Sequence, residues 1–255
     1  MDYAQDVIVV RGAGDLATGV IQKLWRAGFR VAALDLPSPL TIRRTVALST
    51  AMHESVYTVE NMTARRVESA AQCAAAWSAG QIPILADPEM ACLPELRPVA
   101  LVDAILAKRN LGLRRGLAPV TVALGPGFSA PEDADVVVET MRGHSLGRLI
   151  TDGSALPNTG TPGLIGGKSA ERVVHAPCAG RVRHTRKIGD YVEKGECLMP
   201  TGDAPVPSPL SGRPRGLIPP GLEIPQSLKC ADVAPRPASQ VVCLRVTARP
   251  RAPGG

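Results

Sequence analysis

The stretch Asp6-Val-Ile-Val-Val-Arg11-Gly12-Ala-Gly14-Asp15-Leu-Ala17 decides the fold. Residues 6–11 form a short run rich in β-branched side chains, which is typical of a buried parallel strand. The run leads into two glycines and then into a helical stretch over 16–27, which Gly28 ends. Residues 31–34 read as a second strand. The order predicts a strand, a tight turn and a helix that returns the chain to a parallel strand.

The glycine turn carries the pattern of a dinucleotide-binding fold. Gly12, Gly14 and Ala17 fit G-x-G-x-x-[G/A], in which the glycines allow a tight turn and close approach of a pyrophosphate. Asp35 ends the second strand, where a carboxylate binds ribose hydroxyls and disfavours a 2′-phosphate. The pattern therefore predicts NAD or another nucleotide as ligand. Asp15 opposes this interpretation, because its charge repels a pyrophosphate unless it points away, and a Rossmann-like scaffold without a ligand is the alternative.

Further apolar runs follow this unit at 82–86, 100–106, 120–124 and 135–139, and an alanine-rich run predicts a helix over 68–79. This succession predicts an α/β fold with a Rossmann-like, doubly wound parallel sheet in residues 1–150. Ligands of such sheets bind beyond the carboxyl ends of the strands. The residues that follow those strands are accordingly candidates for ligand contacts: Lys108, Gly125, Gly127, Arg142 and His144.

Residues 151–171 are dense in turn-forming residues and predict a connecting loop, in which Asn158 belongs to a stretch able to form anion-binding turns. Residues 172–235 contain a repeat. APCAGRVR at 176–183 matches SPLSGRPR at 208–215 without gaps and with an offset of 32 residues. Two β-rich copies with turn glycines predict a small all-β module with pseudo-twofold symmetry.

The repeat resembles the half-motif of biotinyl- and lipoyl-type domains, which have the barrel-sandwich-hybrid fold. In carriers of this type a modified lysine lies on the hairpin that joins the two halves. The joining stretch here, residues 199–207, has no lysine. The resemblance therefore implies a structural role or a docking surface, and it does not extend to a swinging arm.

Composition excludes several classes of protein. The net charge of +6 invites a nucleic-acid partner, but the basic segment 172–255 has one aromatic residue, Tyr191, and no recognition-helix pattern, so we expect none. No apolar run reaches the roughly 20 residues of a membrane span, and the first residues do not resemble a signal peptide, so we expect a cytoplasmic protein without a membrane partner. The six cysteines are scattered without metal-ligand spacing, so no metal site is predicted.

Several longer motifs resemble one family throughout residues 6–243: the accessory proteins that mature selenium-dependent molybdenum hydroxylases, related to xanthine dehydrogenase accessory factors. The motifs that carry the resemblance are VVRGAGDLATGV, LDLPSPLTIRRTVA, VDAILAKRNLG, LGPGF, VVETMRGHSLGRLI, PNTGTPG and KIGDYVEKGE. The resemblance implies a cytoplasmic protein that acts on, or helps to insert, the molybdenum cofactor of a client hydroxylase. The candidate ligand contacts that it adds by motif match are Gly12, Gly14, Asp15, Lys108, Gly125, Gly127, Arg142, His144 and Asn158.

Two departures from the family pattern stand out. Ser227 occupies a position where the family usually has glycine, so a distorted turn is expected there. Residues 236–255 contain four arginines and no acidic residue, and they lack the expected closing motif, so they are predicted to be an atypical tail, disordered or altered by a frame change.

Three functions follow from these observations. The leading interpretation is a maturation factor whose N-terminal sheet binds a nucleotide or another phosphate-bearing ligand, which includes the molybdenum cofactor or a precursor, while the β module docks the client. The alternatives are an NAD-dependent oxidoreductase and a non-enzymatic adaptor on a Rossmann scaffold. No catalytic residue is predicted, because no nucleophile has a recognisable partner. The sequence leaves open whether the chain forms a homo-oligomer.

Overall fold

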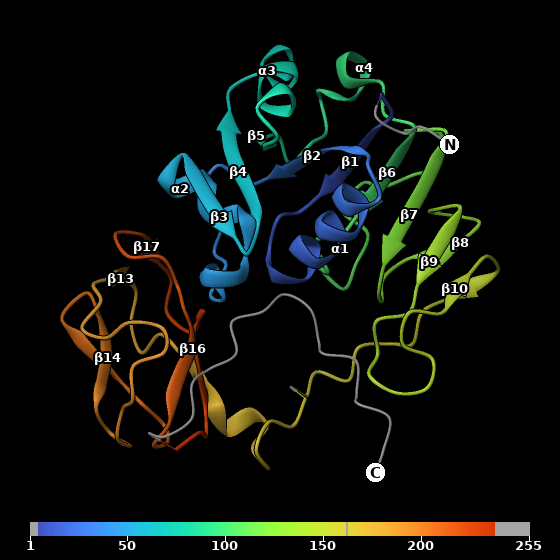
Figure 1. Ribbon diagram of the computed structural model, residues 1–255. Helices are drawn as coiled ribbons and strands as arrows, with labels where there is room; N and C mark the ends of the chain where they lie inside the picture. The colour runs from blue at the N-terminus through green and yellow to red at the C-terminus, as the bar shows by residue number, and fades with distance from the viewer. Residues whose placement is uncertain (1–4, 162, 238–255) are drawn as a thin grey trace, which may run out of the picture. The chain divides into compact units, whose positions relative to one another are not determined.

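The computed structural model describes residues 5–161 and 163–237 of the 255-residue chain. These residues divide into two compact units that are interleaved along the chain (Figure 1). Among the described residues, the first unit comprises the chain up to Pro39 together with Ala47–Thr159, and the second comprises Leu40–Val46 together with the residues from Gly160 to Pro237. From residue 238 on, the predicted atypical tail lies outside the described residues.

The first unit is a mixed α/β structure built on one nine-stranded sheet in the order β10-β9-β7-β6-β1-β2-β5-β4-β3. Its seven inner strands are parallel, and the edge strands β3 and β10 are antiparallel to their neighbours. The strands of the sheet are β1 (Val7–Arg11), β2 (Arg30–Asp35), β3 (Val56–Val59), β4 (Met62–Val67), β5 (Ile82–Ala86), β6 (Ala100–Asp103), β7 (Val120–Leu124), β9 (Val136–Val138) and β10 (Leu149–Ile150). A separate two-stranded ribbon pairs β8 (Ser129–Ala130) with β11 (Gly153–Ser154).

The strand order reverses beside β1. The chain first adds β2 and β5 on one side of β1, and then crosses to place β6, β7 and β9 on the other side. In open parallel sheets ligands bind at such a reversal, beyond the carboxyl ends of the two strands involved, here β1 and β6. The glycine turn predicted from the sequence follows β1, so it lies at this reversal of strand order.

Helices are few and short in the first unit. They are α1 (Asp15–Arg26), α2 (Ala51–Glu54), α3 (Cys73–Ser78) and α4 (Leu93–Leu96), with 3-10 turns at Leu48–Thr50 and Ala70–Gln72. The helix α1 packs Ile21 against Val10 on one face of the sheet, and α3 and α4 bury side chains on the other face. The alanine-rich helix predicted over 68–79 is shorter than expected, because β4 extends to Val67 and the helix begins with a 3-10 turn.

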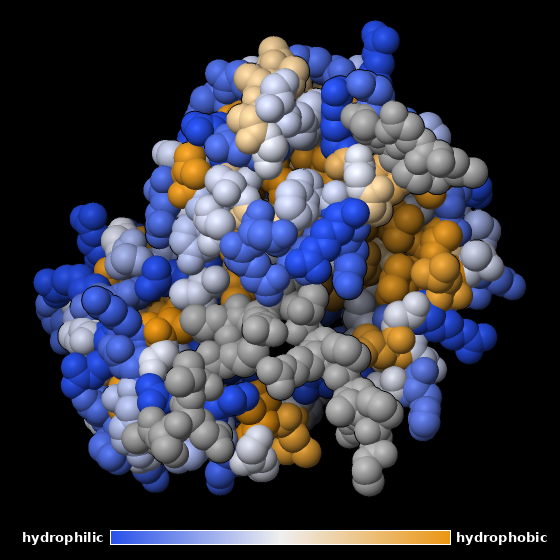
Figure 2. Space-filling view, viewed as in Figure 1, coloured by the Kyte–Doolittle hydropathy of each residue, from blue (hydrophilic) through white to orange (hydrophobic). Residues whose placement is uncertain are grey.

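One face of the sheet has little helical cover at its β9 edge. All residues between β6 and β9 are described and none of them is helical. Side chains on that face remain accessible, with Val120 on β7 44% exposed and Leu149 on β10 67% exposed. Figure 2 shows apolar residues gathered over β7 and β9. No helix in the described ranges combines the length and the apolar character that a membrane span requires.

The second unit is an all-β structure with a core of its own, which includes Val182, Leu198, Leu217 and Val233. Its strands are β12 (Val173–His175), β13 (Gly180–Arg181), β14 (Cys197–Thr201), β15 (Ala204–Pro207), β16 (Arg213–Leu217), β17 (Glu223–Ile224) and β18 (Lys229–Ala234), and its 3-10 turns are Arg44–Val46 and Ala170–Arg172. The segment Leu40–Val46 completes this unit, because Ile42 packs on its core and accepts a hydrogen bond from the N–H of Leu217 at 2.8 Å.

The sequence repeat is also present in the hydrogen bonds of the second unit. The N–H of Ala176 donates to the carbonyl of Leu228 at 2.8 Å, and 32 residues further on the N–H of Ser208 donates to the carbonyl of Glu196 at 2.8 Å. Two more pairs of backbone bonds obey the same offset: Gly195 to Ser208 with Ser227 to Ala176, and Gly189 to Pro214 with Gly221 to Val182. Each half thus makes the same bonds to the other, as a pseudo-twofold repeat requires.

The turn at Ser227 is intact rather than distorted. Ser227 adopts a left-handed conformation with φ of 65°, close to the 88° of its repeat partner Gly195, and it keeps the corresponding hydrogen bond to Ala176. The departure from glycine therefore imposes backbone strain on a retained turn, since left-handed φ costs a residue with a Cβ about 1–2 kcal/mol.

We predict that Ser227→Gly raises the free energy of unfolding of the second unit by about 1 kcal/mol, because relief of the strain exceeds the extra flexibility of glycine in the unfolded chain. The reverse change at the matched position, Gly195→Ser, should lower it by a similar amount. Amide hydrogen exchange of β18 measures both effects. A less stable Ser227→Gly variant would show that the turn is unstrained.

Candidate functional site

The glycine turn joins β1 to α1 at the carboxyl edge of the sheet. Gly12 has a φ of 99°, and a Cβ there would lie 3.2 Å from the backbone of Ala104, which follows β6. Gly12 therefore allows the ends of β1 and β6 to approach closely. Gly14 is different, because its φ of −63° is open to any residue. Ala17, in the first turn of α1, is buried, as the third position of the pattern predicts.

Asp35 holds the glycine turn to the end of β2. One carboxylate oxygen, Oδ2, accepts a hydrogen bond from the N–H of Ala13 at 2.8 Å, and Oδ1 accepts one from the N–H of Leu36 at 2.8 Å. Burial raises the pKa of Asp35 above its ordinary value, although both N–H groups act to lower it. The contacts that the structure gives Asp35 are thus to the turn itself, and its role toward a ribose stays a prediction.

A segment that the sequence did not single out braces the same turn. The 3-10 turn Leu48–Thr50 lies against it, with the N–H of Ser49 donating to the carbonyl of Ala13 at 2.8 Å. The N–H of Leu48 donates to the hydroxyl of Thr18 at 2.9 Å, and that hydroxyl donates to the carbonyl of Gly14 at 2.8 Å. The available signal for this contact was Thr18, a polar residue in the first turn of α1. Its partner Leu48 lies 30 residues away in the sequence, so the contact could not be predicted.

The loops that follow β6, β7 and β9 pack directly on one another. A Cβ on Gly127 would lie 2.5 Å from the Cα of Arg109 and 2.6 Å from the carbonyl carbon of Lys108. A Cβ on Gly125 would lie 2.6 Å from the hydroxyl of Thr140. Both glycines have positive φ, 81° at Gly125 and 100° at Gly127. The turn after β7 is therefore built of glycine because the neighbouring loops touch its backbone.

The loop after β6 contains backbone strain. Leu106 and Lys108 have left-handed φ angles of 59° and 64°, which are uncommon for residues with a Cβ. Such strain persists only where the surrounding structure fixes it, and it concentrates at functional sites. Gly12, Lys108, Gly125 and Gly127 thus belong to adjoining loops along one edge of the sheet, which we take as the candidate site.

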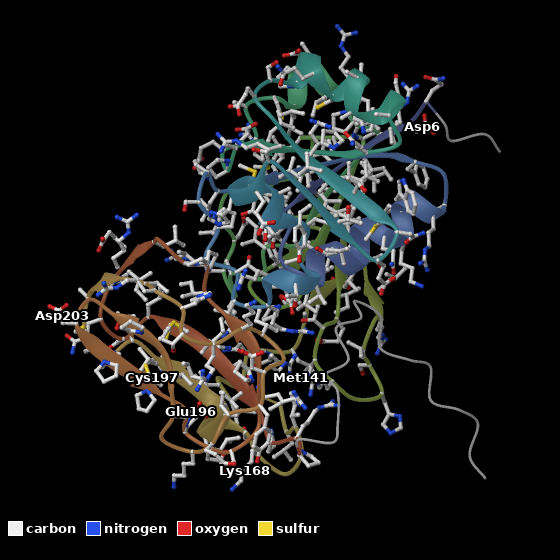
Figure 3. The ribbon with its side chains drawn as sticks, turned by 60° about the vertical axis from the view of Figure 1, so that its left-hand side comes forward. Asp6, Met141, Lys168, Glu196, Cys197 and Asp203 are labelled. Atoms are coloured by element: carbon white, nitrogen blue, oxygen red, sulfur yellow. The ribbon has the colours of Figure 1, made fainter. Side chains whose placement is uncertain are left out.

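The other predicted contacts are more peripheral. Asp15 begins α1 and is half-buried, whereas Arg142 and His144 are exposed on the loop after β9 and Asn158 is exposed beyond β11. None of these four residues is among the nearest neighbours of Gly12, Gly125 or Gly127. The loop that carries Arg142 and His144 also carries Met141, which Figure 3 labels.

Glu139 anchors that loop. The residue is 3% exposed, and its carboxylate accepts hydrogen bonds from the N–H groups of Met141 at 2.6 Å and Leu156 at 2.7 Å. Burial acts to raise the pKa of Glu139, but these N–H groups outweigh it and hold the pKa below its ordinary value. Beside it lies a hollow of about 400 Å³ lined by Glu139, Ser145, Arg148, Leu149, Ile150, Thr151, Asp152, Ser154 and Leu156.

A larger hollow, of about 1110 Å³, lies at the opposite edge of the sheet. Its lining includes Pro98, which lies two residues before β6, and Pro119 and Asp135, which directly precede β7 and β9. Parallel sheets bind ligands at the carboxyl ends of their strands, so we place the candidate site at the glycine turn despite the greater volume here. In the described ranges, no three His, Cys, Asp or Glu residues gather as a metal site would require.

Comparison with known proteins adds one close sequence relative. No protein-family model matches the chain. Over 230 residues, 90% of the chain, it is 46% identical to the uncharacterized protein YqeB of Escherichia coli (strain K12), and these residues make up 42% of YqeB. The chain thus spans less than half the length of this relative. A product-bound structure of the ectoine utilization protein EutE (DoeB) from Ruegeria pomeroyi covers 89% of this chain and 85% of its own at 13% identity, but with a TM-score of 0.26.

Proposed function

We propose that the chain is an accessory protein in the maturation of a selenium-dependent molybdenum hydroxylase, working in the cytoplasm. In this proposal the first unit is a Rossmann-like domain that binds a nucleotide or another phosphate-bearing ligand, and the second unit docks the client. The family-like motifs quoted above support the pathway, and several of them (VVRGAGDLATGV, VDAILAKRNLG and LGPGF) fall on the loops at the carboxyl edge of the sheet.

The observation that carries the ligand proposal is the glycine turn at the reversal of strand order. The helix α1 begins at Asp15, directly after Gly14, and the dipole of a helix favours anions at its N-terminus. The positive φ of Gly12 and its close approach to Ala104 require glycine, whereas the φ of Gly14 is open to any residue. A glycine at such a position suits the close approach of a phosphate group. A molybdenum cofactor precursor and NAD both supply one.

We predict that Gly14→Ser weakens binding of a phosphate-bearing ligand at least tenfold without harm to the fold. Serine is a good residue for the N-cap that Gly14 occupies, so α1 should be as stable as before or more so, while the new side chain enters the space of the phosphate. Titration calorimetry with inorganic pyrophosphate, ADP and NAD measures the affinity. Fluorescence of Trp25, on α1, gives a second readout.

A matched control adds the same side chain at the other end of α1. Ala27 is exposed at the C-cap, so Ala27→Ser should leave every affinity unchanged. Equal binding by wild type and the Gly14→Ser variant would remove the ligand from this turn. Saturable binding of NAD alone, with hydride transfer, would favour an oxidoreductase, and absence of binding by any of the three compounds would favour an adaptor.

For the second unit we propose the barrel-sandwich-hybrid fold. The symmetric exchange of backbone hydrogen bonds between the two halves supports it. The hairpin between the halves, β14 to β15, turns at Gly202 and Asp203 (Figure 3). Because the side chain there is a fully exposed aspartate rather than lysine, we assign this unit to docking instead of group transfer.

The pathway is tested in the cell. We expect that deletion of the gene lowers the activity of the client hydroxylase without lowering the amount of its polypeptide, and that the wild-type gene restores it while Gly14→Ser does not. Unchanged hydroxylase activity in the deletion strain would contradict the proposed role in maturation. The proposal that the glycine turn binds a phosphate-bearing ligand would then depend on the titration experiments alone.

A further inference from the structure

Arg11 is the last residue of β1 and directly precedes the glycine turn, yet its side chain is buried, with 4% exposed. Its Nη1 donates to Oδ2 of Asp103, the last residue of β6, at 3.1 Å. Its Nη2 donates to the carbonyl of Pro88 at 2.7 Å and to that of Leu111 at 2.8 Å, and its Nε donates to Pro88 at 3.1 Å. One guanidinium group thus joins the end of β1 to the end of β6, to the loop after β5 at Pro88 and to the loop after β6 at Leu111.

The two carbonyl acceptors belong to loops that have internal bracing of their own. In the loop after β5, the carboxylate of Asp87 accepts the N–H groups of Ala91 and Cys92, both at 2.9 Å. In the loop after β6, Oδ1 of Asn110 accepts the N–H groups of Gly112 and Leu113, at 2.9 and 2.8 Å. Each loop is therefore braced by its own side chain, and Arg11 connects both loops to the end of β1.

Asp103 extends the same connection. Besides Arg11, its Oδ1 accepts the N–H of Ile105 at 3.2 Å, at the start of the loop with left-handed Leu106 and Lys108. Burial raises the pKa of Asp103, which shows that the carboxylate is held in a poorly solvated place. The strained loop is thus fixed at one end by Asp103 and further along by Leu111, and the backbone of Arg109 lies against Gly127.

We infer that Arg11 and Asp103 are positioning residues, which set the loops after β5 and β6 against the glycine turn and so shape the ligand site. The claim that they shape a ligand site rests on the proposed function. An arginine suits the task because its planar fork reaches several acceptors at once. The competing explanation is a buried ion pair that only adds to overall stability.

The two explanations differ in the double variant Arg11→Met/Asp103→Leu. Apolar replacement of both partners of a buried pair is often close to neutral for stability, but it removes every bond to Pro88 and Leu111. We expect amide hydrogen exchange in the whole chain to accelerate at least tenfold at Ala91, Cys92, Ile105, Gly112 and Leu113. Exchange at the centre of β1 should change less than twofold.

The matched control is the buried pair of the second unit, Arg172 with Asp232. Arg172→Met/Asp232→Leu should leave the exchange of the five reporter amides unchanged. Unchanged or uniformly faster exchange across the first unit in the Arg11 and Asp103 variant would overturn the inference. If that variant does not fold, Asp103→Asn carries the same measurement, with acceleration expected at Ile105 and Gly112.

Binding of inorganic pyrophosphate separates this inference from the proposed function. If wild type binds it, the double variant should bind at least tenfold more weakly, and equal affinity would show that the pair does not shape the site. If wild type does not bind pyrophosphate, the proposal that the glycine turn binds a phosphate-bearing ligand is contradicted. The change in hydrogen exchange at the reporter amides still decides whether Arg11 and Asp103 position the loops.

Discussion

Replacement of Gly127 by alanine should lower the free energy of unfolding of the first unit by about 3 kcal/mol or more. The new Cβ would lie 2.5 Å from the Cα of Arg109 and 2.6 Å from the carbonyl carbon of Lys108, and neither backbone atom can move without its loop. Overpacking of this kind costs about 1–3 kcal/mol, and the φ of 100° adds about 1–2 kcal/mol for a residue with a Cβ.

The control for this variant is Gly116→Ala. Gly116 also has a positive φ, of 85°, but a Cβ there meets nothing within 4 Å, so only the backbone penalty of about 1 kcal/mol is expected. Both tryptophans of the chain, Trp25 and Trp77, belong to the first unit, so denaturation followed by tryptophan fluorescence reports on that unit. Equal losses in the two variants would mean that the loops after β6 and β7 do not touch as described.

The second large effect is expected in the other unit, where Asp232→Asn should cost about 3 kcal/mol. Asp232 and Arg172 form an ion pair with side chains 6% and 7% exposed, and Arg215 lies 3.6 Å from the same carboxylate. Loss of one charge leaves Arg172 buried without compensation, which typically costs about 3–5 kcal/mol. Amide exchange of β18 follows the stability of this unit.

Two comparisons test the cause of that loss. The exposed pair of Arg183 and Asp203 is the control, and Asp203→Asn should give no measurable change, because solvent screens such pairs. The double change Arg172→Met/Asp232→Leu should recover part of the stability, since it removes both charges of the pair but takes the carboxylate away from Arg215. An Asp232→Asn variant as stable as wild type would show that the pair contributes nothing.

Much of the first unit could be predicted from the sequence, because its buried strands are continuous apolar runs. The strands at β1, β2, β5, β7 and β9 lie where those runs predict them. The hairpin of β3 and β4 was not predicted, since its residues alternate between buried and exposed and include two arginines, Arg65 and Arg66. The helices expected between the later strands were inferred from the pattern of a doubly wound fold rather than from helical periodicity, and the chain from β6 to β9 has none.

Gly12, Gly125 and Gly127 were singled out in the sequence as ligand contacts; the structure shows close approaches of neighbouring loops at all three, and the ligand contacts stay predictions. The candidate site was not predictable where one side chain joins distant loops. Arg11 belongs to a quoted motif, but its acceptors Pro88 and Leu111 are backbone carbonyls, and a carbonyl leaves no mark on the sequence. The bracing of the turn by Ser49 is likewise a backbone contact, so its side chain gave no signal.

The interleaving of the two units has a consequence for how such a protein can evolve. Leu40–Val46 belongs to the second unit, while the residues on both sides of it belong to the first. A gene fragment that begins at Gly160 would encode the β module without Ile42, whose carbonyl and side chain complete it. A single recombination event at Gly160 would therefore separate Leu40–Val46 from the rest of the second unit. The pair should be inherited together.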